Sequence, residues 1–260
     1  MKCDANVLLL FAIVVICILN IKATIGSNYY AYAHYFTSDQ SAEFLSLLHQ
    51  IDIEIALMNE TFPSEIDTSY YHAKNAAELM NKTYHLTNAI SPVDFHIIYE
   101  EEQLTNDDNS TVQALVVANI ADEILRRYGE AYNVGYDLTN MSNMLITQSI
   151  NAHGMESHLN SLANNDGGNE LVLVSEGDYQ SAQALSKEAI NIFERKLRPL
   201  PEFENNGNNI KTPFVSKVRD SLLELNILLN NKASPEDLMN IVHTQIHPSL
   251  QIAYNLKLKK

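Results

Sequence analysis

The sequence contains little cysteine, little glycine and no tryptophan. Its two cysteines, Cys3 and Cys17, both lie close to the N-terminus, so the rest of the chain has no thiol. The body can therefore form neither a disulfide bond nor a metal site built on thiolates. Only eight glycines occur in 260 residues, while 46% of the residues are hydrophobic. This composition favours a helical fold over a turn-rich β fold.

Positive charge is also scarce. The 17 Lys and Arg residues are outnumbered by 32 Asp and Glu residues, which gives a net charge of −15. Such an acidic body repels phosphates, so we expect no nucleic-acid partner. The phosphate loops, nucleophile elbows, zinc-protease motifs and Glu-x-x-His motifs of common enzyme classes are missing. We therefore predict that the protein is not an enzyme.

The N-terminal segment, residues 1–26, carries an apolar run from Val7 to Leu19. As a helix this run is about 20 Å long, which is shorter than the ~30 Å hydrocarbon core of a membrane. The length favours an export signal that is cleaved after Ala23 or Gly26, and the alternative is a retained N-terminal anchor. Either interpretation predicts that the body, residues 27–260, lies in the extracellular space or cell envelope.

Four Asn-x-Ser/Thr sequences agree with export and would make the protein a glycoprotein. They begin at Asn59, Asn81, Asn109 and Asn140. We expect Asn109 to lie in a polar loop, which makes it the best acceptor of the four.

The C-terminal region predicts two helices joined by a short turn. Thr212 and Pro213 are typical of a helix start, as are Ser234 and Pro235. Apolar residues then recur at steps of three and four. The first stripe is Val215, Val218, Leu222, Leu225 and Leu229, and the second is Leu238, Ile241, Val242, Ile246, Ser249, Ala253 and Leu256.

The same rhythm predicts further helices upstream. We expect them at about 38–60, 68–89, 111–134, 136–163 and 178–198. Asp178 would cap the last of these helices. The residues of the second helix that we expect to face inward are Tyr70, Ala73, Ala77, Met80 and Tyr84. The fold class is therefore all-α: an antiparallel bundle of six or seven helices. A polar, glycine-containing stretch suggests a further boundary near 164–177. An ungapped shift of 171 residues also aligns the first and last helix pairs, which predicts two pseudo-repeated helical hairpins.

Histidine is the one residue type that suggests a site. His243 and His247 are four apart, so on a helix they share a face and could bind a divalent transition metal with a third ligand. The internal alignment places His72 on His243 and so nominates His72 as that ligand. The alternative is a pair of surface histidines at a kink, because their face lies away from the apolar stripe and Pro248 disfavours helical angles at His247.

A second group of polar residues could bind a cation. His153, Glu156 and His158 lie close together in sequence, and a solvated helix end explains them equally well. The sequence thus favours an exported or membrane-tethered helical domain that binds an unknown protein or an envelope component, without cofactor or catalysis. Contact with a membrane would occur only through an uncleaved N-terminal segment. The alternative is a metal- or cofactor-binding bundle that uses His72, His243 and His247.

Overall fold

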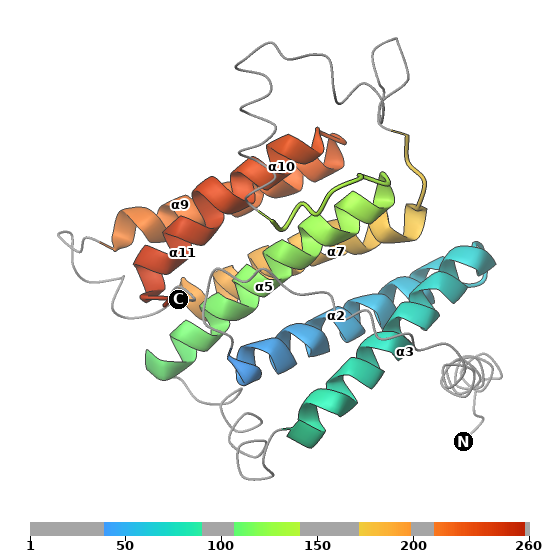
Figure 1. Cartoon of the computed structure of the whole chain (residues 1–260), viewed down its shortest axis with the longest axis horizontal. Coiled ribbons are helices and arrows are strands. Elements are labelled where there is room, and N and C mark those ends of the chain that lie inside the picture. The colour runs from blue at the N-terminus through green and yellow to red at the C-terminus, as the bar shows by residue number, and fades with distance from the viewer. Residues whose placement is uncertain (1–38, 90–106, 141–171, 199–210, 258–260) are drawn as a thin grey trace. The chain divides into compact units, whose positions relative to one another are not determined.

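The computed structural model describes residues 39–89, 107–140, 172–198 and 211–257 (Figure 1). These residues form helices and connecting turns, and no strand occurs among them. The α-helices are α2 (Gln40–Thr61), α3 (Ile66–Ala89), α5 (Asp107–Ala131), α7 (Glu176–Ile192), α9 (Thr212–Asn230), α10 (Pro235–Ile241) and α11 (His247–Tyr254).

Two short π-helices join some of these elements. The π-helix η2 (Phe193–Leu197) continues α7, and η3 (Val242–Ile246) connects α10 to α11. The described residues therefore contain six continuous helical segments, which confirms the predicted all-α bundle of six or seven helices. The antiparallel order and the internal repeat stay predictions.

The chain divides into two compact units. The first contains α2, α3 and α5 up to Asn119, and the second runs from Ile120 to Lys257. The predicted signal or anchor at 1–26 and most of the predicted boundary at 164–177 lie outside the described residues. Among the helices that are described, none has the length and apolar character required to cross a membrane.

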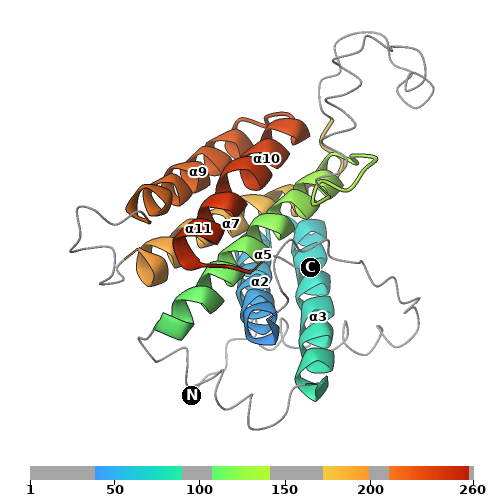
Figure 2. The same cartoon turned by 60° about the vertical axis from the view of Figure 1, so that its left-hand side comes forward.

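In the first unit, α2 and α3 pack against each other, and both views show them side by side (Figures 1 and 2). The Asp39 carboxylate caps α2 by accepting hydrogen bonds from the backbone N–H groups of Ser41 and Ala42, at 2.8 and 3.1 Å. Leu47 and Ile51 of α2 then form a buried apolar cluster with Leu79 of α3.

The inward face of α3 differs from the prediction. Tyr70 and Tyr84 are more than half exposed, whereas His72, Ala76 and Leu79 are buried. Ala73 and Ala77 are buried as predicted, and the prediction was wrong for the two tyrosines, which it treated as core residues. In the structure the phenol groups stay near water, and His72 is buried because it has a carboxylate partner.

In the second unit, α9 packs against α7, α10, η3 and α11. Every residue of the two predicted C-terminal stripes is buried, from Val215 to Leu229 and from Leu238 to Leu256. Ser234 caps α10, as the sequence predicts: its Oγ accepts from the Asp237 backbone N–H at 3.2 Å. Thr212 does not cap α9, whose N-terminal boundary residue is Lys211 and has no side-chain cap.

Two predicted boundaries were wrong. The helix expected to begin at 136 does not start there, because residues 132–140 form turns, and its remainder lies outside the described residues. The Asp137 carboxylate stabilises one of these turns by accepting from the Thr139 backbone N–H at 2.9 Å. Asn109 belongs to the first turn of α5 rather than to a loop.

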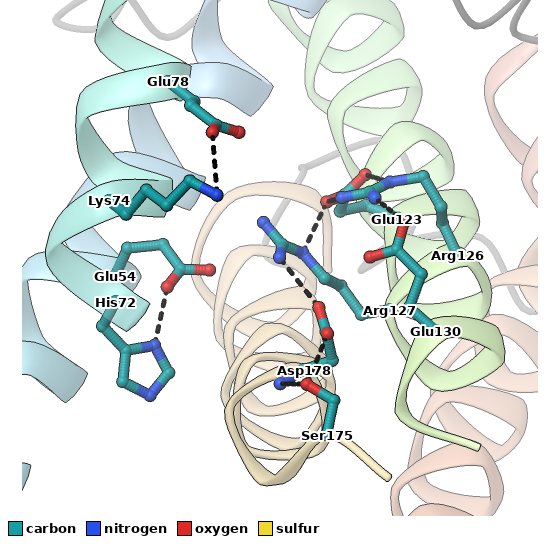
Figure 3. A network of polar contacts seen from close by, with 10 residues as sticks. All are labelled: Glu54, His72, Lys74, Glu78, Glu123, Arg126, Arg127, Glu130, Ser175 and Asp178. Atoms are coloured by element: carbon teal, nitrogen blue, oxygen red, sulfur yellow. Dashed lines mark hydrogen bonds and ion pairs between the residues drawn. The ribbon is translucent and has the colours of Figure 1, made fainter. Parts of the chain in front are cut away.

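A buried ion-pair network fixes α5 against the start of α7 (Figure 3). The guanidinium of Arg127 donates to Glu123 on its own helix and to Asp178 on α7, both at 3.0 Å. Asp178 also accepts from the hydroxyl of Ser175 at 2.6 Å, and Ser175, not Asp178, is the cap of α7. The network positions the second half of α5, which carries Asp122.

Candidate metal-binding site

Three potential metal ligands meet inside the second unit: Asp122 from α5, His243 from η3 and His247 from the start of α11. Each offers one ligand atom, and these atoms all lie within 4.8 Å of one another. The three residues are only 8%, 3% and 5% exposed, respectively. Buried charged and polar groups of this kind are paired, or they coordinate a metal.

A π-helical turn presents the two histidines. The backbone N–H of His247 donates to the carbonyl of Val242, five residues earlier. In a regular α-helix, the ring of Pro248 would collide with the carbonyl of Thr244, and Pro248 has no N–H to bond it. Widening the helix at η3 accommodates the proline. The sequence repeats this spacing at η2, since Pro199 follows Leu197 as Pro248 follows Ile246.

The backbone at the proline differs from the prediction. His247 has φ −59° and ψ −48°, which are helical angles, so Pro248 does not remove it from the helix. The rings of His243 and His247 remain neighbours, with centroids 5.4 Å apart and planes at 71°. The alternative of two surface histidines was also wrong. The turn at 132–140 covers His243, because the carbonyl of Leu138 forms a hydrogen bond with the ring of His243.

The contact between His247 and Asp122 is longer than an ordinary hydrogen bond. Nε2 of His247 lies 3.4 Å from Oδ1 of Asp122, whereas N–H···O bonds usually measure about 2.7–3.2 Å. A tetrahedral zinc ion holds its nitrogen and oxygen ligands about 2.0–2.2 Å away, which separates neighbouring ligand atoms by about 3.3 Å. The observed separation therefore matches one edge of such a site.

The hydrogen bond of His243 fixes which ring nitrogen carries the proton. Its Nε2 lies 3.0 Å from the Leu138 carbonyl oxygen. A carbonyl only accepts, so Nε2 is the donor, and the lone pair of the neutral ring is on Nδ1. Burial and then the nearby His247 lower the pKa of His243, which favours this neutral form. Metal-binding histidines commonly donate their second nitrogen to a carbonyl in the same way.

His72, the third ligand that the sequence nominated, is not part of this cluster. It belongs to the first unit, where its Nδ1 lies 2.7 Å from Oε2 of Glu54 on the neighbouring helix (Figure 3). Both side chains are buried. His153, Glu156 and His158, the second group considered, lie outside the described residues.

Sequence reasoning missed Asp122. A signal was available, because Asp122 and Glu123 interrupt a segment whose residues Ile120, Ala121, Ile124 and Leu125 are all fully buried. Because the residues on both sides of the acidic pair are apolar, this part of the helix has no polar face that could hold the two carboxylates in solvent. Both carboxylates are therefore buried and require partners: Glu123 pairs with Arg126 and Arg127, whereas Asp122 lies 3.4 Å from the ring of His247.

The chain matches no protein family, no curated protein and no solved structure.

Proposed function

We propose that the second unit binds one divalent transition-metal ion through Asp122, His243 and His247. The observation that carries this proposal is the convergence of three buried ligand atoms within 4.8 Å. It retains His243 and His247 from the sequence prediction and replaces His72 with Asp122.

The donor set selects the class of metal. Two imidazole nitrogens and one carboxylate oxygen suit zinc, cobalt, nickel or copper, whereas calcium and magnesium require mainly oxygen ligands. The 3.4 Å edge between His247 and Asp122 fits the short bonds of a first-row transition metal. A divalent ion would also compensate the negative charge of the buried Asp122 carboxylate. Zinc is the ion used to test the site, because imidazole and carboxylate ligands are common at tetrahedral zinc sites.

The competing explanation is a polar cluster that stabilises the core without a metal. Elemental analysis of the purified protein, followed by calorimetric titration of the metal-free chain with Zn²⁺, separates the two. We expect one zinc per chain, lost in Asp122→Asn and His247→Gln. The matched controls are Asp220→Asn and His85→Gln, because both residues are exposed. Binding that survives in Asp122→Asn, or is equally lost in the controls, would overturn the proposal.

A second proposal concerns where the domain acts. We propose that residues 1–26 export the chain, as a cleaved signal or an anchor, and that the body binds a protein or envelope component without catalysis. Its support is the apolar run at Val7–Leu19 together with large apolar residues that α3 leaves exposed, Ile66, Tyr70 and Tyr84. N-terminal sequencing of the protein from its native host, with fractionation of the cells, tests export directly. A cytoplasmic product that retains Met1 would contradict it.

A further inference from the structure

The coordination number of the proposed site suggests what else it binds. We infer that the ion at Asp122, His243 and His247 keeps one coordination position for a small exogenous ligand, namely water or a small anion. This inference rests on the proposed metal site.

The ligand count is the first argument. Among the residues that the structure describes, the cluster has three members. Zinc and cobalt in proteins prefer four ligands, and sites with three protein ligands complete the tetrahedron with water or another small molecule. A site that serves only as a structural support has all four ligands from the protein.

The arrangement of the three residues is the second argument. Nε2 of His243 is already bonded to the Leu138 carbonyl, so His243 can offer a metal only its Nδ1. Oδ1 of Asp122 lies 3.4 Å from Nε2 of His247, which is close to the distance between two ligand atoms of a tetrahedral zinc ion. The three donors come from α5 and from η3–α11 and lie within 4.8 Å of one another, so they can occupy three corners of a coordination tetrahedron and leave the fourth to a molecule from solvent.

The burial of the site limits the size of this ligand. All three residues are buried. A molecule that reaches the fourth position must therefore be about the size of water or a linear triatomic anion. The two oxygens of Asp122 provide the competing arrangement, because a bidentate carboxylate would occupy the position itself.

Cobalt provides a direct readout, since Co²⁺ takes the geometry of zinc sites and its visible absorption reports coordination number and ligand exchange. The metal-free full-length protein is titrated with CoCl₂, and the cobalt complex is then titrated with sodium azide. Equilibrium dialysis confirms that the cobalt stays bound. The Asp122→Asn variant serves as the site-deficient control, and His85→Gln as the control for an exposed histidine.

We expect intense tetrahedral cobalt bands that shift with azide until one equivalent is bound, in the wild-type chain and in His85→Gln. Bands that form but do not respond to azide would overturn the open position, while the metal site would stand. Failure of the chain to bind cobalt or zinc would overturn the metal site and the open position together. Cobalt removal by azide would also count against an open position.

Discussion

Both units bury a histidine beside a carboxylate, yet the two pairs differ in geometry. In the first unit, His72 and Glu54 are 2.7 Å apart, which is a normal hydrogen-bond length. In the second unit, His247 and Asp122 are 3.4 Å apart, and a second histidine ring lies beside the first. Residue types alone do not distinguish these pairs. The separation and the additional imidazole do.

The comparison suggests two different uses of the same chemical groups. A single histidine at hydrogen-bond distance satisfies a buried carboxylate and leaves no room for an ion between them. Two histidines and a carboxylate whose ligand atoms lie within 4.8 Å of one another bring three donors close enough to share one ion. We therefore expect α2 and α3 to depend on their pair for stability, and α5, η3 and α11 to respond to metal.

The largest expected effect is loss of zinc binding when a ligand is removed. Loss of an outer hydrogen-bond partner of a metal ligand lowers affinity by about 10- to 100-fold, and loss of the ligand itself lowers it further. His243→Gln should therefore bind Zn²⁺ more than about 100-fold more weakly than wild type. His72→Gln should bind as wild type does, measured by competition with a chromophoric chelator. Equal losses in both variants would remove the distinction between the two pairs.

The next effect concerns stability in the first unit. Replacing His72 with leucine takes this partner from a buried carboxylate, and breaking a buried pair costs about 3–5 kcal/mol. The double variant His72→Leu/Glu54→Leu should recover much of the loss, because no buried charge remains. Urea unfolding measures both, with His85→Leu as the exposed control. A His72→Leu variant as stable as wild type would show that the pair contributes nothing.

The third prediction separates the units by their response to metal. Zinc at about 100 times its dissociation constant should stabilise the folded chain by about 2.7 kcal/mol. Hydrogen-exchange mass spectrometry should place the added protection in α5, η3 and α11 rather than in α2 and α3. The effect should vanish in Asp122→Asn and persist in Glu54→Gln. Protection confined to α2 and α3 would contradict the assignment.

The helices of both units could be predicted from apolar periodicity, and the limits of that method are instructive. It identified the buried stripes of α9 and of α10–α11, because the residues at steps of three and four, all apolar except Ser249, became buried. At α3 it was right for Ala73 and Ala77 but wrong for Tyr70 and Tyr84, whose aromatic rings carry a polar hydroxyl and are more than half exposed. It also could not find η3, because a π turn adds one residue without changing the apolar character of its neighbours.

The candidate site was predictable in part. The spacing of His243 and His247 indicated a shared face, but their burial depends on the turn that carries Leu138, and this turn was predicted to be helix. Asp122 belongs to a helix that is distant in sequence from the two histidines. The spacing of residues within one helix does not show which other helix packs against it. The internal alignment suggested His72 instead. An alignment of this kind compares positions in the sequence and does not show which residues are in contact in the folded protein.

The smallest expected effect comes from an ion pair close to His72 on α3. Lys74 and Glu78 are 3.7 Å apart, but their side chains are 58% and 49% exposed (Figure 3). Exposed pairs one turn apart on a helix contribute about 0.3–0.5 kcal/mol, and a lysine that precedes its glutamate is the weaker orientation. A double-mutant cycle with Lys74→Ala and Glu78→Ala is required, because alanine also changes helix propensity. We expect a coupling energy below about 0.5 kcal/mol that disappears at high salt. A coupling as large as that of His72 with Glu54 would show that burial is not what separates strong pairs from weak ones in this protein.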